Sequence, residues 1–421
     1  MVREPPLLKL KMTVRIISLR DQSEAKALMR DLGVETGGIE IMSPKTIPAL
    51  VRINNLPIFA ANILKQESLS IGADTAVSRD ALTGKKKHTD CLIIGNLTHI
   101  HRLSEKLKRQ PYGLNKIALE LQAAFNNYQK DNFILALKNH QLNLASQTRI
   151  MGIINLTPDS FSGDGLYQSQ KSKVKSQNLN NIVDYAKKLA DDGADMLDIG
   201  AESTRPGAKP VSAKDEIKRL IPALKRIRKE INLPISIDTY KAETAKAALD
   251  NGADIINDIS ALTSDKKMAK IISRHKAGVV LMHMRGIPKN MHKNPAYQSL
   301  MGEIIEYLNK SIAIALEAGI DFEKIIVDPG IGFGKTLEHN LEIIKSLAQL
   351  KILGRPILIG LSRKSFLGKI THQGPKERLS STISSNCLAV FNGAKIVRVH
   401  DVKEAKQAFM ALDRILKCPS Q

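Results

Sequence analysis

The chain has 421 residues, of which 43% are hydrophobic and 25% are charged, and its three cysteines lie far apart. These values are typical of globular proteins and argue against a disordered chain, a disulfide-rich secreted fold and a CxxC zinc site. A net charge of +21 would suit nucleic-acid binding if the basic residues were concentrated, but the excess is spread along the chain. We therefore expect no nucleic-acid partner, and instead a diffuse field that attracts anionic substrates.

The first part of the chain, residues 1–147, mixes short apolar runs with amphipathic segments. The expected strands are 14–18, 49–53 and 92–95, and the expected helices are 23–32, 57–67 and 115–128. This pattern predicts a smaller α/β domain, and the polar segment 126–147 predicts a linker after it. The first residues lack the apolar stretch of a secretory signal, and nowhere do 18 apolar residues occur together. We expect a cytoplasmic protein without a membrane partner.

From Arg149 onward, short apolar runs alternate with longer amphipathic segments, which is typical of repeated strand–helix units in a parallel sheet. The expected strands are 150–154, 196–199, 235–237, 255–256, 279–282, 325–327, 357–359 and 396–399. The expected helices are 179–192, 213–230, 241–251, 297–318, 337–350, 376–391 and 402–416. This order predicts an α/β fold, a closed (β/α)8 TIM barrel over residues 148–418.

The expected strands end in polar or ionisable residues. These residues are Asn155, Asp198 with Glu202, Asp238, Asn257, His283, Asp328, Ser362 with Lys364, and Arg398 with His400. In barrel enzymes the active site lies at the carboxyl ends of the strands, so these side chains should converge on one pocket. Polar residues begin many loops, but their recurrence in phase on eight strands favours a functional site.

The barrel region also contains seven short motifs in a fixed order, each at a strand end. They are MGIINLTPDSFS (151–162), DIGAESTRPGA (198–208), SIDT (236–239), INDIS (256–260), DPGIGFGK (328–335), SRKS (362–365) and RVHD (398–401). Through these motifs the region resembles the dihydropteroate synthase family along its whole length. The resemblance implies condensation of 6-hydroxymethyl-7,8-dihydropterin pyrophosphate with p-aminobenzoate, giving 7,8-dihydropteroate and pyrophosphate. It also implies a homodimer and a sulfonamide target.

The resemblance assigns one group of residues to the pterin. Asp238, Asn257 and Asp328 match the family's pterin-binding positions, and Met282 ends the strand between the last two. A pterin edge presents an amino group and ring N–H groups beside acceptors, so a buried site needs carboxylates and an amide. Lys364 matches the lysine that bonds the pterin carbonyl and lines the approach of the amine. Helix capping is the ordinary alternative for the two aspartates.

A second group matches the family's pyrophosphate and metal site. The leaving group is a multiply charged anion, and its departure requires cations or N–H donors. Arg398 and His400 lie two residues apart on one expected strand, so their side chains point the same way. Asn155 ends the neighbouring first strand, and its amide oxygen is the expected ligand of Mg²⁺, the expected cofactor.

Two loops complete the family's site. By resemblance, p-aminobenzoate is framed by Thr204, Arg205, Pro206, Phe333 and Ser365. The first loop departs from the family pattern, since Ser-Gly-Asp-Gly (162–165) stands where Ser-Asp-Gly-Gly is usual. The acidic residue that would steady the cation-like pterin methylene is thus displaced by one position, and Asp164 is the candidate for that role.

Other functions fit these residues less well. A pterin-dependent methyltransferase has a similar barrel with the same Asp and Asn, but should lack the SRKS and RVH elements. The run from Gly330 to Lys335 resembles a phosphate loop, but Pro329 occupies the position of the required first glycine.

For residues 1–147 the role stays unknown. No glycine-rich acidic pattern resembles a pterin pyrophosphokinase there. His99 and His101 lack a Cys or carboxylate partner in the sequence, which favours a loop or surface position over a metal site. We expect packing, oligomerisation or regulation rather than catalysis.

Overall fold

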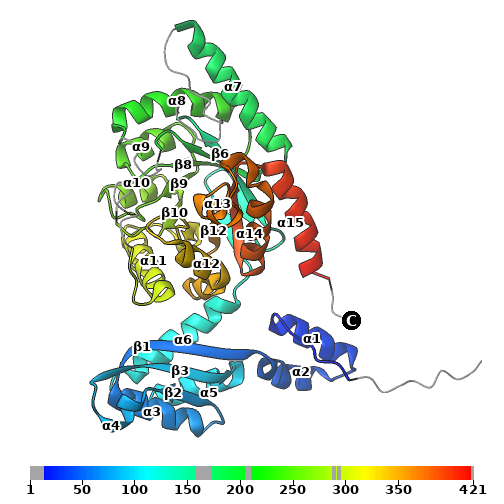
Figure 1. Cartoon of the computed structure of the whole chain (residues 1–421), viewed down its shortest axis with the longest axis vertical. Coiled ribbons are helices and arrows are strands. Elements are labelled where there is room, and N and C mark those ends of the chain that lie inside the picture. Colours follow the sequence, from blue (N-terminus) through cyan, green and yellow to red (C-terminus); the bar gives the residue numbers. More distant parts are fainter. Residues whose placement is uncertain (1–13, 158–171, 204–209, 287–290, 292–294, 419–421) are drawn as a thin grey trace, which may run out of the picture. The chain divides into compact units, whose positions relative to one another are not determined.

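The computed structural model describes residues 14–157, 172–203, 210–286, 291 and 295–418. The chain divides into two compact units, one that runs to Ala123 and one from Ala124 to Lys417. Figure 1 shows both units, coloured along the sequence.

The first unit is built on a three-stranded antiparallel sheet in the order β1-β3-β2. Its strands are β1 (Pro48–Pro57), β2 (Asp74–Val77) and β3 (His88–Asn96). Its helices are α1 (Gln22–Asp31), α2 (Thr36–Met42), η1 (Ser43–Thr46), α3 (Ile58–Leu69), α4 (Arg79–Thr83) and α5 (Leu97–Leu107). Thr89, Cys91 and Ile93 are buried on β3 while the residues between them are exposed, as expected for a sheet that is covered on one face.

The structure corrects two expectations for this unit. Residues 14–18 form no strand, although their Val and Ile content favoured one. His99 and His101 lie on helix α5 instead of in a loop, because the Asn96 side chain accepts the His99 backbone N–H at 3.0 Å and caps the helix. His101 is exposed.

The second unit is a closed parallel barrel with the strand order expected from the sequence. Its strands are β6 (Arg149–Asn155), β7 (Met196–Gly200), β8 (Ile235–Asp238), β9 (Ile255–Asp258), β10 (Gly278–Met282), β11 (Ile325–Asp328), β12 (Ile357–Ile359) and β13 (Ala394–Val399). Strand β13 pairs with β6 and closes the ring. The predicted (β/α)8 TIM barrel is confirmed, and the eight predicted strands all overlap those of the structure.

Helices follow the strands around the barrel (Figure 1). They are α7 (Ser172–Asp191), α8 (Ala213–Glu230), α9 (Ala242–Asp250), α10 (Met268–Arg274), α11 (Leu300–Glu317), α12 (Leu337–Lys345), α13 (Ser365–Thr371), α14 (Leu379–Phe391) and α15 (Val402–Leu416). Short 3-10 turns are η2 (Phe322–Lys324), η3 (Leu347–Leu353) and η4 (Pro375–Glu377). The seven-residue helices α10 and α13 were not expected, because so short a segment carries little apolar periodicity.

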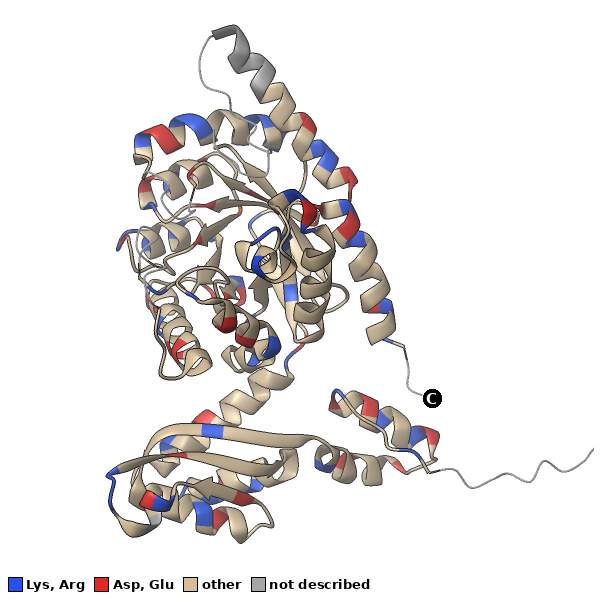
Figure 2. Ribbon diagram, in the orientation of Figure 1, with Lys and Arg blue, Asp and Glu red and all other residues tan. Residues whose placement is uncertain are grey.

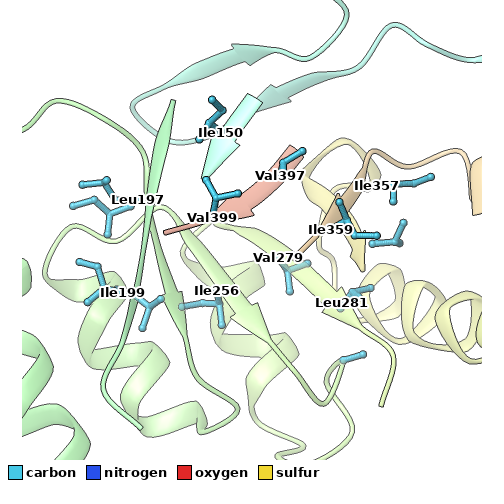
Figure 3. Packing of buried hydrophobic residues seen from close by; sticks show 14 of the residues in the cluster. Ile150, Leu197, Ile199, Ile256, Val279, Leu281, Ile357, Ile359, Val397 and Val399 are labelled. Atoms are coloured by element: carbon cyan, nitrogen blue, oxygen red, sulfur yellow. The ribbon is translucent and has the colours of Figure 1, made fainter. Parts of the chain in front are cut away.

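Side chains alternate along each barrel strand between two buried layers. Those that face the helices form the main core, and Figure 3 shows Leu197 and Ile199 projecting from the same side of β7. The residues between them point into the barrel. Met196 belongs to a separate inner cluster, and Asp198 is two positions further on along the same face. The strand period therefore carries polar side chains into the barrel just above an apolar layer.

A small hairpin covers the end of the barrel at which the parallel strands begin. Its strands are β4 (Ile134–Ala136) and β5 (Gln141–Asn143), which pair antiparallel after helix α6 (Leu114–Gln129). Four hairpin side chains pack against inward-facing residues of the barrel strands. The cluster comprises Phe133, Leu135, Leu137 and Leu144 with Met151, Met196, Ile255, Val280, Ile326, Leu358 and Ile396.

This hairpin changes the expected domain boundary. The sequence placed a linker at 126–147 and the barrel domain from 148, whereas the barrel unit begins at Ala124 and includes the hairpin. In this segment Phe133, Leu135 and Leu137 are buried and the residues between them are exposed. The many Asn and Gln residues around them make this alternation hard to recognise in the sequence.

Charged residues are interspersed on the outer surface of the barrel. Figure 2 shows Lys and Arg beside Asp and Glu on the same helices, including α8 and α15. Among the described residues, no helix is both long and apolar enough to span a bilayer.

Candidate active site

The carboxyl ends of four neighbouring strands bring predicted site residues to one level of the barrel. Asn155 of β6 is in register with Gly200 of β7, and Gly200 with Asp238 of β8. Asp238 is in turn in register with Asn257 of β9. Gly200 lies between the other two residues, since a Cβ there would be in van der Waals contact with both, 3.6 Å from the Asp238 Cβ and 3.9 Å from Asn155 Oδ1. An amide, a carboxylate and a second amide thus line one side of the barrel mouth.

The guanidinium of Arg398 joins two carboxylates across the barrel. Its Nε donates to Asp198 Oδ2 at 2.6 Å, and its Nη2 donates to Asp238 Oδ2 at 3.2 Å. Asn257 Nδ2 donates to the same Asp198 oxygen at 3.3 Å. Asp198 is fully buried, and its Oδ1 has no hydrogen-bond partner among the described residues. A buried acceptor without a donor is costly, so this oxygen is suited to an N–H group of a ligand.

The charges and burial of this cluster affect Arg398 and Asp238 differently. Burial opposes the charge of Arg398, but Asp198 and Asp238 raise its pKa, so the guanidinium stays charged. Burial raises the pKa of Asp238 to about 7; Arg398 opposes this rise, and the charges of Asp198, Glu216 and Glu202 add to it. Asp238 therefore changes protonation near neutral pH.

The titration of Asp238 leads to a pH-dependence prediction. The carboxylate accepts N–H groups, whereas the protonated acid loses one acceptor, so kcat/KM for a pterin substrate should fall below about pH 7. In Asp238→Asn, kcat/KM should be lower at all pH values and should no longer fall below pH 7 (the acid limb of the profile). The check is kcat/KM against pH for both proteins, with Asp195→Asn at the opposite end of β7 as the control that keeps the limb. An unchanged limb in Asp238→Asn would assign the titration to another group.

Asp328 at the end of β11 and Lys364, the residue before α13, interact through their charges. Asp328 Oδ1 accepts the Gly330 backbone N–H at 2.7 Å, and burial raises the pKa of this carboxyl while the Lys364 cation opposes the rise. Burial lowers the pKa of Lys364 to about 8, against the attraction of Asp328. Lys364 Nζ donates to the Ile331 carbonyl and lies 4.8 Å from the Phe333 ring centroid. Phe333 is half-buried beside this ammonium.

His400 is held by the end of strand β12. Its Nδ1 is 3.0 Å from Ser362 Oγ, and its backbone N–H donates to the same oxygen at 3.2 Å. These two bonds fix the imidazole on the strand that carries Arg398. The expected pair of Arg398 and His400 thus lies at one barrel end, with Ser362 as its support.

The remaining predicted residues are placed unevenly. Met282 is buried and in register with Asp328, and Ser365 is exposed as the first residue of α13. The predicted residues Asp164, Thr204, Arg205 and Pro206 lie outside the described residues.

Sequence reasoning gave no role to several residues that organise the site. Asp198 was recognised only as a polar strand end, yet it receives both Arg398 and Asn257. Its position two residues after the inward-facing Met196 is the signal that could have found it. Glu202 serves the following loop instead of the ring, because it binds Lys241, Tyr240 and the Val211 N–H.

The side-chain oxygens near Asn155 suit a metal ion that is coordinated mainly by the phosphate groups of a ligand. Among the described residues, no group of three His, Cys, Asp or Glu side chains could hold a metal ion by itself. Mg²⁺ commonly takes one or two protein oxygens and fills its other positions with water and phosphate. The Asn155 oxygen, which lies beside Gly200 and near Asp238, suits such partial coordination.

Comparison with known proteins points in one direction. The family described as pterin binding enzyme matches residues 151–400. The dihydropteroate synthase of Synechocystis sp. is 44% identical over 270 residues, 64% of this chain and 90% of the relative. That of Bacillus subtilis is 42% identical over 283 residues, 67% of this chain and 94% of the relative.

Solved structures agree with the sequence relatives. The Yersinia pestis dihydropteroate synthase in a sulfonamide drug complex has a TM-score of 0.64 and 35% identity, with 68% of this chain and 100% of that chain covered. The Xanthomonas albilineans dihydropteroate synthase with 4-aminobenzoic acid has a TM-score of 0.62 and 35% identity over the same shares.

Proposed function

This chain belongs to the dihydropteroate synthase family of pterin-binding enzymes, and from that premise we propose which of its residues carry out the family's reaction. The barrel unit is a transferase of folate biosynthesis that joins dihydropterin pyrophosphate to p-aminobenzoate. Relatives of this name that match over nine-tenths or more of their own length favour it over a methyltransferase. The observation that carries the residue assignment is the convergence of Asp238, Asn257, Asp328, Lys364 and Arg398 at one barrel end.

The pterin would lie among the acidic and amide side chains. Asp238, Asn257 and Asp328 supply acceptors for the amino and ring N–H groups, and Asn257 also offers an N–H donor. Lys364 would donate to the pterin carbonyl, and Met282 would contact the ring from the wall beside Asp328. A polar ring bound without these partners would lose about 1–3 kcal/mol for each unmatched group.

The chemical step is a substitution at the pterin methylene carbon. The amine lone pair of p-aminobenzoate forms the new C–N bond, the C–O bond to pyrophosphate breaks, and the amine proton leaves to solvent. Arg398 and His400 would stabilise the charge that develops on the departing oxygen. Phe333, Ser365, Thr204, Arg205 and Pro206 would hold the amine, and Asp164 would steady the cation-like methylene.

We assign Mg²⁺ to this site as cofactor, with Asn155 as its protein ligand. Bound there, the ion would neutralise negative charge on the pyrophosphate. Asn155→Ala should raise the Mg²⁺ concentration for half-maximal activity about tenfold while leaving the melting temperature in chelator unchanged. Titrations of Mg²⁺ against activity and against melting temperature check both parts. Equal Mg²⁺ dependence in the two proteins would remove Asn155 from the metal site.

The function is tested by a coupling assay on the full-length protein with dihydropterin pyrophosphate, p-aminobenzoate and Mg²⁺. Dihydropteroate and pyrophosphate should form in equal amounts. A folded protein that makes neither product would contradict the assignment.

For the first unit we propose a role in packing, oligomerisation or regulation, without catalysis. A protein that starts at Ala124 should therefore keep the synthase activity, and turnover of a pterin precursor by the first unit would contradict this role.

We also propose a cytoplasmic homodimer formed by the barrel units. Leu388 and Phe391 of α14 and Met410 and Ile415 of α15 are exposed apolar side chains on neighbouring helices, which supports a covered surface there.

A further inference from the structure

The run from Gly330 to Lys335 has a use that its resemblance to a phosphate loop does not suggest. It forms the loop after β11, in which Gly330, Gly332 and Gly334 have φ values of 68°, 81° and 64°. A Cβ at Gly330 would lie 1.9 Å from the His283 carbonyl oxygen, and one at Gly334 would lie 2.4 Å from that of Arg285. The alternate glycines therefore allow this loop to pack directly on the backbone that follows β10.

The lysine that ends the run turns back into its own loop. Lys335 is 5% exposed, and its Nζ donates to the carbonyls of Gly330 at 2.8 Å and Phe333 at 3.0 Å. The third partner is the His283 ring, whose Nδ1 lies 3.0 Å from Nζ. In a phosphate loop the lysine reaches outward to an anion. Here its three donor positions are matched by protein acceptors, so it is not placed to reach a ligand.

The histidine is a suitable neutral acceptor for the Lys335 amine, whose pKa burial lowers to about 7 against the attraction of Asp328. Burial, with the charges of Lys335 and Arg285, lowers the pKa of His283 to about 2, so the imidazole is neutral and has one ring nitrogen without a proton. Nδ1, which lies beside the Lys335 donor, is suited to be that acceptor. Its ring packs edge-on against Tyr307 at 5.0 Å between centroids. The Tyr297 ring lies 6.1 Å from the His283 ring between centroids, and its hydroxyl donates to the Gly334 carbonyl at 2.9 Å. The inner side of the loop is thus fixed at three of its carbonyls.

The opposite side of the same loop faces Lys364. Lys364 Nζ donates to the Ile331 carbonyl, and its ammonium is 4.8 Å from the Phe333 ring centroid. A Cβ at Gly332 would lie 3.3 Å from Lys364 Cδ. The position of the loop therefore determines where both Lys364 and the Phe333 ring lie.

We propose that Lys335 is a positioning residue for the amine substrate, which it serves by holding the 330–334 loop, with its Phe333 ring, against Lys364. This inference rests on the proposed function. The lysine itself touches no substrate. Without its ammonium, the carbonyls of Gly330 and Phe333 lose their shared donor and the loop can shift. Of the proposed pterin contacts, Asp328 and Lys364 touch this loop, whereas Asp238 and Asn257 lie on other strands. We therefore expect p-aminobenzoate binding to be affected more than pterin binding.

The test compares Lys335→Met with Lys324→Met in the full-length protein. Lys324 just before β11 is a matched control, because its side chain is also largely buried, at 14% exposure, and pairs with Asp321 at 2.8 Å. We expect Lys335→Met to raise the KM for p-aminobenzoate at least tenfold and the KM for dihydropterin pyrophosphate less than threefold. Lys324→Met should leave both KM values within twofold, whatever it does to the melting temperature.

Two further variants separate position from stability. Lys335→Met leaves the buried His283 Nδ1 without its partner, and the double variant His283→Leu with Lys335→Met removes that nitrogen. Compared with Lys335→Met, the double variant should therefore melt at a higher temperature, while its KM for p-aminobenzoate stays high. Lys335→Gln retains amide donors, and it should fold and raise that KM severalfold if Lys335→Met does not fold.

Three results would overturn the inference. They are an unchanged p-aminobenzoate KM in Lys335→Met and Lys335→Gln, a KM that recovers together with the melting temperature, and a fall in kcat alone. Wild-type protein without synthase activity would instead overturn the proposed function, and the inference with it.

Discussion

Arg398→Met is expected to lower kcat/KM for dihydropteroate formation by about 10³-fold, the size found when a preorganised electrostatic group is removed from an active site. Arg398 is the cation shared by the Asp198 and Asp238 carboxylates, at 2.6 and 3.2 Å. Its removal leaves those acids without their counter-charge and the departing pyrophosphate without a donor. The pKa of Asp238 should rise further, because Arg398 opposes the effect of burial. Steady-state kinetics and the acid limb of the pH profile measure both effects.

The control for Arg398 lies on the same strand. Lys395 is at the amino end of β13 and pairs with Asp131 at 3.4 Å, far from the polar ends of the strands. Lys395→Met should change kcat/KM less than threefold, since the lower end of a barrel serves stability more than catalysis. A comparable loss in both variants would show that β13 acts through stability, and activity retained by Arg398→Met would remove Arg398 from the mechanism.

Removal of the hairpin is expected to have the largest effect on stability. A protein that starts at Gln147 lacks Phe133, Leu135, Leu137 and Leu144, which are all buried against the barrel strands. Each such side chain contributes about 1.5–3 kcal/mol on burial. Their sum is comparable to the entire stability of a typical domain, about 5–15 kcal/mol. We expect the shorter protein to be insoluble or to melt at least 10 °C lower than one that starts at Ala124.

The hairpin prediction has a single-residue counterpart in the full-length protein. Leu135→Ala should lower the free energy of unfolding by about 2–5 kcal/mol, whereas Ile134→Ala on the exposed side of the same strand should cost much less. Denaturant unfolding of both variants measures the difference. Equal melting temperatures for the proteins that start at Ala124 and Gln147 would contradict the role of the hairpin.

The sequence predicted the barrel well because its strands are short apolar runs with polar ends. Ile235 to Asp238, for example, has a buried inward Ser236, and the next inward position carries the acid. The same alternation places Asp328 and Arg398, so both could be assigned from the strand period alone.

Other features depended on partners that are distant in sequence. The hairpin strands have three residues each, too few to show a pattern, and they are stabilised by the barrel residues that they cover. The role of Asp198 depends on Arg398, 200 positions later. Strand β2 was missed because Asp74–Val77 is short and becomes a strand through its pairing with β3.

The hairpin that covers the amino ends of the barrel strands also limits where substrates can bind and leave. The inner layer of the barrel is packed with side chains that the hairpin covers, so substrates can enter and leave only at the carboxyl ends of the strands. The acids that we propose to bind the pterin lie on the strands themselves, whereas Phe333 and Ser365 belong to the loop and helix beyond them. A bound amine would therefore stand in the exit path of the pterin. Substrates should load in the order pterin then amine, and an occupant of the amine position should trap the pterin beneath it.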